Sequence, residues 1–196
     1  MLEKGRYYMD NLARKEPPRT EIIAGKTVLM SPRPLIRHTL VASNIYYIFA
    51  KYLHGKTCVP FADGVDVHLN EQNWFVPDAM IVCNPDIIKE NGIYGAPDLV
   101  VEVISPSTMR YDRGPKMQAY AKAGVKEYWL VTPLARSVEV YLNHGGVFEI
   151  DETYAVYSEA DLSVMNDEEK AAIKPQIKVS LYDDLLVNVE DVFYRL

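Results

Sequence analysis

A short apolar strand followed closely by a helix, within residues 95–120, constrains the fold more than any other part of this sequence. A Pro-Asp turn signal at residues 97–98 opens it, and the run Leu-Val-Val-Glu-Val-Ile that follows is typical of a buried strand. Side chains alternate between the two faces of a strand, so Glu102 shares its face with Asp98 and Ile104. A carboxylate inside a buried strand is costly to desolvate unless something such as a cation compensates it. Glu102 is therefore the first candidate for a functional residue.

The length and charge of the chain set the broad class. We expect a polar lead-in over residues 1–20 and one domain over residues 21–196, long enough to bury a single core. The sequence has no run of eighteen apolar residues and no signal-peptide pattern, so we expect a cytoplasmic protein with no membrane association. The net charge of −6 argues against a protein that coats nucleic acid, because such proteins bind mainly by neutralising phosphates. A local basic cleft is still compatible with this charge.

The two cysteines, Cys58 and Cys83, lie in apolar, strand-like contexts. Their separation does not match the close pairs that bind metal ions. We expect two buried thiols, and the sequence leaves a disulfide between them open.

The order of the expected elements indicates an α+β fold with a mixed sheet. These elements are a hairpin over residues 21–31, an amphipathic helix over 35–53, a hairpin over 57–69 that turns at Asp63-Gly64, strands over 75–83 and 98–104, a helix over 112–123, strands over 125–132 and 137–143, and an antiparallel edge strand over 147–151. Residues 84–94 are expected to be a loop, residues 158–174 a loop with a helical turn, and residues 177–196 a strand and a short helix.

A second acid, Asp78, lies within the apolar run 75–83, which is the strand before the one that carries Glu102. If the two strands pair, their carboxylates can share one face of the sheet and reach one ion. Magnesium prefers oxygen ligands, usually one or two carboxylates together with waters and substrate phosphate. Asp78 and Glu102 suit this pattern.

Lys116 lies in the first turns of the helix that follows the Glu102 strand, and Tyr120 occupies the same helical face one turn later. A helix that follows a strand commonly folds back over the sheet, which would aim Lys116 at the two carboxylates. From there its amine could orient a metal-bound water and offset charge on a phosphoryl group.

These residues belong to a longer pattern: Glu21, Pro32, His38, Val76-Pro77-Asp78, residues 97–103, Ser105-Pro106-Ser107, Asp112, Lys116, Tyr120 and residues 124–129. The pattern spans about residues 21–141 and resembles the Uma-two family of endonuclease-like proteins, which is placed in the PD-(D/E)XK nuclease superfamily. The resemblance implies a restriction-endonuclease-like αβββαβ core with a mixed central sheet, an extra N-terminal hairpin and a C-terminal extension. It also implies metal-dependent phosphodiester hydrolysis of nucleic acid.

The resemblance further implies roles for individual residues. Asp78 and Glu102 match the two acids of the superfamily motif, and with the Val103 carbonyl they are expected to bind Mg²⁺ or Mn²⁺. Ile104 stands where the motif has its lysine, so Lys116 is expected to replace that lysine from the helix and to position the attacking water.

Further residues are assigned a supporting place. Glu21 and His38 match family positions that face the same cleft, and Tyr120 is expected to lie behind the site. Asp98 shares a face with Glu102 but follows Pro97, where an acid can simply satisfy a turn, so its role stays open. Asp112 is expected to cap the start of the next helix.

Three functions are compatible with these residues. The leading interpretation is a metal-dependent DNA endonuclease that acts as a homodimer, because one small domain needs a two-fold partner to cut both strands. The alternative is a catalytically inactive nucleic-acid- or protein-binding module on the same fold. Hydrolysis of another phosphodiester would use the same ion chemistry.

Overall fold

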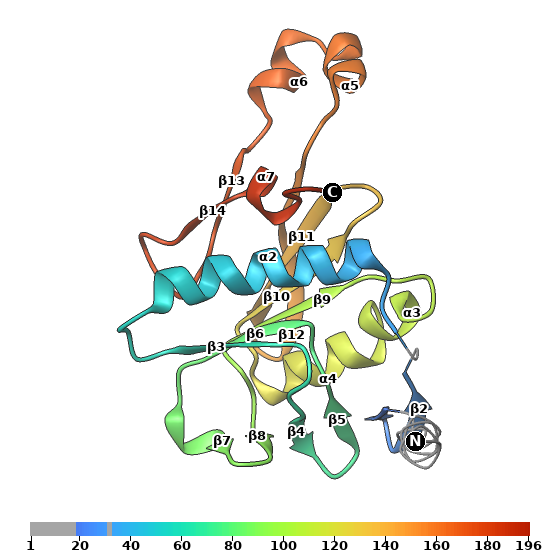
Figure 1. The fold of residues 1–196 in the computed structure, drawn as a ribbon, viewed down its shortest axis with the longest axis vertical. Helices are drawn as coiled ribbons and strands as arrows, with labels where there is room; N and C mark the ends of the chain where they lie inside the picture. Colours follow the sequence, from blue (N-terminus) through green and yellow to red (C-terminus); the bar gives the residue numbers. More distant parts are fainter. Residues whose placement is uncertain (1–18, 31–32) are drawn as a thin grey trace, which may run out of the picture.

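The computed structural model describes residues 19–30 and 33–196, so most of the expected lead-in over residues 1–20 lies outside the described residues. The described chain has an α+β architecture built on a twisted central sheet (Figure 1). None of its described helices is long and apolar enough to span a membrane.

Six strands form the central sheet in the order β12-β11-β10-β9-β6-β3. They are β3 (Val59–Ala62), β6 (Ala79–Val82), β9 (Leu99–Val103), β10 (Glu127–Thr132), β11 (Ser137–His144) and β12 (Val147–Ala155). β10 runs parallel to β9, and the other neighbouring strands are antiparallel, so the sheet is mixed as expected. All five residues of β9 are buried, which fits its place inside the sheet.

Helices cover both faces of this sheet. On one face lies α2 (Ile36–Leu53), whose Val41, Ile45 and Phe49 recur every fourth residue and pack against the core beside Val101 and Trp129. The short helix α7 (Val189–Val192) lies beside α2. On the other face lie α3 (Met109–Asp112) and α4 (Pro115–Ala123). The succession α2, β3, β6, β9, α4 and β10 confirms the expected αβββαβ core.

A second six-stranded sheet packs on the α4 side of the core, in the order β2-β1-β5-β4-β8-β7. Its strands are β1 (Thr20–Ile23), β2 (Lys26–Leu29), β4 (Val67–Asn70), β5 (Asn73–Phe75), β7 (Ile88–Lys89) and β8 (Gly92–Tyr94), with the 3₁₀ helix η1 (Pro85–Ile87) before β7. The β1–β2 hairpin confirms the extra N-terminal hairpin. The expected loop over residues 84–94 instead contributes β7, β8 and η1.

The expected hairpin at Asp63-Gly64 is wrong, because β3 and β4 belong to different sheets. The Asp63 carboxylate binds the Arg19 guanidinium at 2.9 Å, and Gly64 has φ of 102°, so this bend leads the chain from one sheet to the other. The expected single strand over residues 75–83 is also divided, into β5 and β6. Pro77 lies at the break and has no N–H for a strand ladder.

The expected helix over residues 112–123 is likewise divided, because α3 ends at Asp112 and α4 begins at Pro115. Gly114 lies between them, where a Cβ atom would come within 2.7 Å of the Arg110 carbonyl oxygen. The tight turn therefore requires a glycine, and it sets the direction in which α4 leaves.

Cys58 and Cys83 form a disulfide, so the expectation of two buried thiols is wrong. The pairing of β3 with β6 places Val59 opposite Val82, and the next pair of positions in this antiparallel register is 58 and 83. The two half-buried cysteines therefore meet because strand register brings them together.

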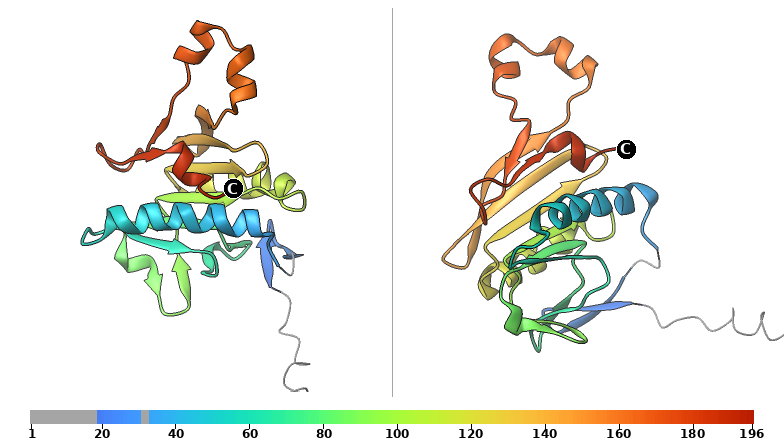
Figure 2. Two further views of the ribbon diagram at one scale, coloured as in Figure 1. Left: turned by 45° about the horizontal axis from the view of Figure 1, so that its top comes forward. Right: turned by 60° about the vertical axis from the view of Figure 1, so that its left-hand side comes forward.

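The C-terminal extension includes an arm that projects from the body of the protein (Figure 2). The chain leaves β12, forms α5 (Glu159–Val164) and α6 (Asp167–Ala171), and returns through β13 (Gln176–Lys178), which pairs with β14 (Leu186–Asn188). Each arm helix begins with a reciprocal capping box, formed by Ser158 with Asp161 and by Asn166 with Glu169. The expected loop with a helical turn is thus two capped helices.

Glu127 fastens the C-terminal extension to the core. Its fully buried carboxylate accepts hydrogen bonds from the Trp129 indole at 2.6 Å and from the Ser180 backbone N–H at 2.7 Å. We expect Glu127→Gln to lower the free energy of unfolding by about 2 kcal/mol, because an amide group cannot accept both bonds. Urea titration would measure this loss, and Glu149→Gln, at an exposed position of β12, should change stability by less than about 0.5 kcal/mol. Equal effects of the two substitutions would contradict the prediction.

Candidate active site

Asp78 and Glu102 lie opposite each other on neighbouring strands. β6 and β9 pair with Ala79 opposite Val101, and the same register places Asp78 opposite Glu102. The Asp78 backbone N–H donates to the Val101 carbonyl at 3.2 Å, so Asp78 lies beside β9 although it precedes the first residue of β6. Both side chains therefore lie on the face of the sheet that α4 covers, as the sequence predicts.

Lys116 extends from the first turn of α4 into a group of three carboxylates. Its Nζ lies 2.7 Å from Glu102 Oε1, 3.0 Å from Glu21 Oε1 and 3.5 Å from Asp112 Oδ1. Only 3% of Lys116 is exposed, and its ammonium group also faces the Phe75 ring at 5.5 Å from the centroid. The helix thus delivers the amine to the strand carboxylates, as expected.

Glu21 and Tyr120 hold this group from two further elements. Glu21, on β1, accepts the Val76 backbone N–H at 2.9 Å with the same Oε1 that contacts Lys116. Tyr120, one turn after Lys116 on α4, donates its hydroxyl to Glu102 Oε1 at 3.1 Å. The N-terminal hairpin and the helix therefore fix the positions of the amine and of one strand carboxylate.

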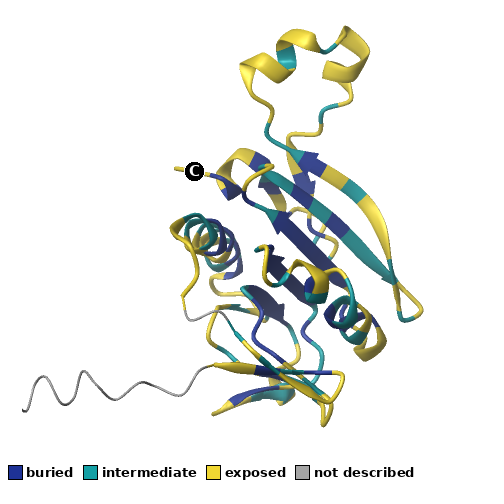
Figure 3. Ribbon diagram, turned by 90° about the vertical axis from the view of Figure 1, so that its right-hand side faces the viewer, coloured by how far each residue is buried: buried dark blue, intermediate teal, exposed yellow. Residues whose placement is uncertain are grey.

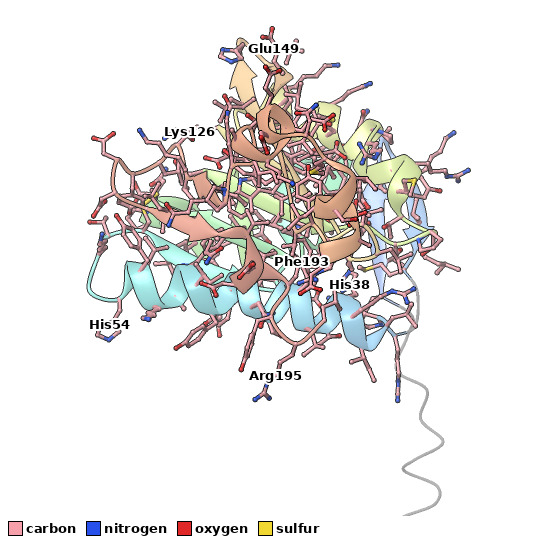
Figure 4. All side chains as sticks on the ribbon, turned by 90° about the horizontal axis from the view of Figure 1, so that it is seen from above. His38, His54, Lys126, Glu149, Phe193 and Arg195 are labelled. Carbon is pink, nitrogen blue, oxygen red and sulfur yellow. A yellow bond between two sulfur atoms is a disulfide. The ribbon has the colours of Figure 1, made fainter. Side chains whose placement is uncertain are left out.

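His38 and Asp78 form the more open side of the cluster. His38 Nε2 lies 3.3 Å from Asp78 Oδ1, and Asp78 Oδ2 accepts the Val103 backbone N–H at 2.7 Å. The side chains of His38 and Asp78 are 18% and 13% exposed, against 4% for both Lys116 and Glu102. His38 lies near the start of α2, at the opposite end of the helix from His54 (Figure 4). Solvent and ligands therefore reach the cluster past Asp78 and His38.

The cluster carries more negative than positive groups. It contains the carboxylates of Glu21, Asp78, Glu102 and Asp112, the Lys116 amine and the His38 imidazole. Burial raises the pKa of the Glu102 carboxyl well above its ordinary value, and the neighbouring acids raise it further against the influence of Lys116. Burial also raises the pKa of Asp112. Such an excess of acids is relieved by bound protons or by a cation.

Neighbouring carboxylates raise the pKa of both basic groups of the cluster against the effect of burial. Burial lowers the pKa of Lys116, but Glu102, Glu21 and Asp112 outweigh it and hold the value well above that of an ordinary amine. Burial likewise lowers the pKa of His38, and the hydrogen bond to Asp78 reverses the shift, so that the imidazole binds its proton more tightly than usual.

The donor atoms suit a hard divalent cation in part. Within residues 19–30 and 33–196, no group of three or more His, Cys, Asp or Glu side chains is arranged to hold a metal ion by itself. Asp78 and Glu102 instead offer two carboxylates opposite each other, which is the sparse protein contribution that Mg²⁺ accepts when waters and substrate oxygens complete its shell. Val103, expected as a carbonyl ligand, donates its backbone N–H to Asp78 Oδ2, and its role as a ligand stays a prediction.

Asp112 belongs to the cluster, and the expectation that it caps a helix is wrong. It is the last residue of α3, and the cap position of α4 is occupied by Gly114. Asp112 is 1% exposed, and its Oδ1 has no hydrogen-bond partner in the described part of the chain. One sequence signal could have placed Asp112 in the cluster: it lies four residues before Lys116, and residues four apart are neighbours on a helix.

Asp98 does not join the cluster. Its carboxylate accepts the Cys83 backbone N–H at 2.7 Å and binds Lys126 Nζ at 2.8 Å. It precedes β9, four residues before Glu102, which corresponds to about 13 Å along a strand. The structure therefore favours the turn-stabilising interpretation of Asp98.

Arg113 anchors the turn before α4 to β11 through a two-pronged ion pair with Glu139, at 2.5 and 2.7 Å. The hydrogen bonds from Arg113 lower the pKa of Glu139. The stabilisation is therefore complete above the unfolded-state pKa and is lost as the pH falls through the folded-state pKa. We expect Glu139→Gln to cost about 0.5–1 kcal/mol near neutral pH, because the pair is partly exposed. The difference in stability between the parent and Glu139→Gln should vanish in acid. Urea titrations at neutral and at acid pH would measure it, and a difference that persists in acid would contradict the assignment of the ion pair.

The fold is that of a restriction-endonuclease-like protein. The family model Uma2 (Uma-two), described as "Putative restriction endonuclease", matches residues 7–168, and the chain belongs to this family. The chain is 35% identical over 109 residues to "Uncharacterized protein slr1290" of Synechocystis sp., an alignment that covers 55% of this chain and 56% of that protein. It is also similar to the crystal structure of "a putative nuclease belonging to DUF820" from Anabaena variabilis, with a TM-score of 0.68, 21% identity, and coverage of 94% of this chain and 96% of that one. The likeness to that structure establishes the fold.

Proposed function

We propose that the protein is a metal-dependent phosphodiester hydrolase that acts on DNA. One arrangement carries the proposal: Asp78 and Glu102 face each other across paired strands, and Lys116 Nζ lies 2.7 Å from Glu102. Two strand carboxylates can hold a divalent ion that activates a water, and an amine beside them can offset charge on a phosphate. The family match, under its printed description, supports the same reaction class.

Each residue of the cluster has a distinct task in this mechanism. Asp78 and Glu102 would hold Mg²⁺ or Mn²⁺, which when bound supplies positive charge to the scissile phosphate and lowers the pKa of a water. Lys116 orients the attacking water and offsets charge that develops on the phosphoryl oxygens. Glu21 and Asp112 keep the Lys116 amine in place and protonated. His38, on the open side, holds Asp78 and meets the incoming substrate first.

Lys116 takes the task from the helix because the strand position cannot. Ile104, at the motif position of the lysine, is 7% exposed and belongs to the hydrophobic cluster beneath α4.

A second observation favours the alternative of an inactive binding module on the same fold. Lys116 already contacts three carboxylates, which is also what a purely structural counter-ion would do.

Cleavage and metal binding distinguish the two functions. The purified chain should nick supercoiled plasmid in Mg²⁺ or Mn²⁺ and not in EDTA. Titration with either metal should raise the melting temperature, since an ion that binds only the folded state stabilises it. A rise in melting temperature without cleavage of plasmid, single-stranded DNA or RNA would support the binding module. Cleavage of RNA or of small phosphodiesters alone would keep the ion chemistry and overturn the choice of DNA.

A further inference from the structure

Charge is strongly segregated along this chain. Residues 22–62 contain five Lys and Arg residues and no Asp or Glu. Residues 137–169 contain nine Asp and Glu residues and no Lys or Arg. The first segment includes α2 and the second includes β12, α5 and most of α6. A protein with a net charge of −6 thus has one acid-free region and one region without basic residues other than histidine.

The outer side of α2, which we call the basic face, combines cations with exposed apolar side chains. Ile36 is 79% and Tyr47 65% exposed, and their spacing of eleven residues places them on one stripe of the helix. Lys51 and the half-buried Arg37 lie on one side of this stripe, and neither forms an ion pair with any residue in the described ranges. We take these exposed apolar groups together with the unpaired cations as the candidate surface for a partner.

The projecting segment 158–172, which we call the acidic arm, lacks a core of its own. Its helices α5 and α6 have six and five residues and no buried residue, although helices this short depend on packing for stability. Val164 at the end of α5 is 84% exposed, and nearly the whole arm is exposed in Figure 3. Glu159 and Glu168 form no ion pair with a described residue. The arm therefore offers an apolar tip surrounded by free carboxylates.

The two surfaces are complementary but stand apart within one protomer. The arm extends beyond the sheet and away from α2 in every ribbon view of Figures 1–3. We propose that the acidic arm of one protomer binds the basic face of a second copy, and that the second copy returns the same contact. Two such contacts, related by a two-fold axis, form a closed dimer. This proposal does not depend on whether the cluster hydrolyses DNA.

A protein partner fits the basic face better than a nucleic acid does. Two cations over the eighteen residues of α2 are a low charge density for binding a polyanion, whose affinity scales with the number of phosphates neutralised. The large apolar side chains of the face, Ile36 at the first position of α2 and Tyr47 in its second half, would stay exposed against a phosphate backbone. The acidic arm supplies both an apolar residue and carboxylates.

Charge reversal on each surface tests the contact. Arg37→Glu with Lys51→Glu reverses the basic face, and Glu159→Lys with Glu168→Lys reverses the arm. By analytical ultracentrifugation in about 50 mM salt, we expect the parent chain to dimerise and each variant to have a dissociation constant raised at least about tenfold, because like charges then meet. Raising the salt to about 500 mM should also weaken the parent dimer. Lys89→Glu with Lys122→Glu, at exposed positions on β7 and α4, is the matched control and should leave dimerisation unchanged.

Mixing the two reversed proteins gives the decisive result. The reversed arm of one meets the reversed face of the other, and the two unreversed surfaces also match, so the mixture should form a heterodimer. A chain that carries all four substitutions should dimerise with itself. Circular-dichroism melts establish that every variant folds. The proposal is overturned if the parent is monomeric at about 100 µM or if the mixture stays monomeric. It is also overturned if reversal of the basic face reduces DNA binding and leaves dimerisation unchanged.

Discussion

Asp78→Asn and Glu102→Gln should each reduce DNA cleavage by on the order of a thousandfold or more, since the charge stabilisation that a metal ion provides is worth several kcal/mol. Each substitution should also remove the metal-dependent rise in stability. For the parent chain this rise should reach about 2.7 kcal/mol at a metal concentration of about one hundred times Kd. Plasmid nicking and thermal melts with and without Mn²⁺ would measure both quantities.

Asp98→Asn is the matched control for these substitutions. It removes one carboxylate from the end of β9 that lies away from Glu102, and the amide oxygen can still accept the Cys83 N–H. Cleavage and the metal-dependent stabilisation should therefore stay at the parent level. If Asp78→Asn keeps the metal response while Asp98→Asn loses it, the ion binds elsewhere and the assigned centre is wrong.

Lys116→Met should lower the free energy of unfolding by about 3–5 kcal/mol near neutral pH, because it leaves buried carboxylates without their counter-charge. Methionine fills nearly the same volume, so the loss reports on charge more than on packing. The loss should shrink as the pH falls, since Glu102 and Asp112 already have raised pKa values and take up protons first. Urea titrations of the parent and Lys116→Met from neutral to acid pH would measure the change in this loss.

Lys122→Met is the control on the same helix. Lys122 is exposed and should tolerate the substitution within about 0.5 kcal/mol. A loss for Lys116→Met that does not change with pH would mean that packing, and not unpaired carboxylates, is responsible. If Lys116→Met folds, binds Mn²⁺ as the parent does and still cleaves DNA, then Lys116 does not act on the attacking water.

Local pattern predicted the centre of the fold and the Asp78, Glu102 and Lys116 part of the cluster, whereas Glu21 and His38 were expected only from the resemblance to the Uma-two family. The apolar run before and after Glu102 identifies β9, and the period of two places its side chain on a defined face. The order of elements then makes the Asp78 strand its neighbour, and the helix that follows brings Lys116 back over the sheet. These inferences succeed because every step uses adjacent elements of the chain.

The remaining features depend on contacts between distant parts of the chain. Asp63-Gly64 has the composition of a hairpin turn, yet Arg19 and the second sheet determine where the chain goes there. The disulfide follows from the register of β3 and β6, which the spacing of two cysteines does not reveal. Asp112 has the position of a cap in the sequence, and only the division of the helix at Gly114 turns it toward Lys116.

The hairpin that precedes α2 has a consequence for dissecting the protein. Glu21 on β1 accepts a hydrogen bond from the Val76 N–H and contacts the Lys116 amine, so an element outside the αβββαβ unit supplies one of the groups that position the lysine. A minimal fragment that starts at α2 would keep both strand acids but lose this support. Attempts to trim the chain to its smallest nuclease-like unit, or to graft the unit onto another scaffold, must therefore carry the hairpin along.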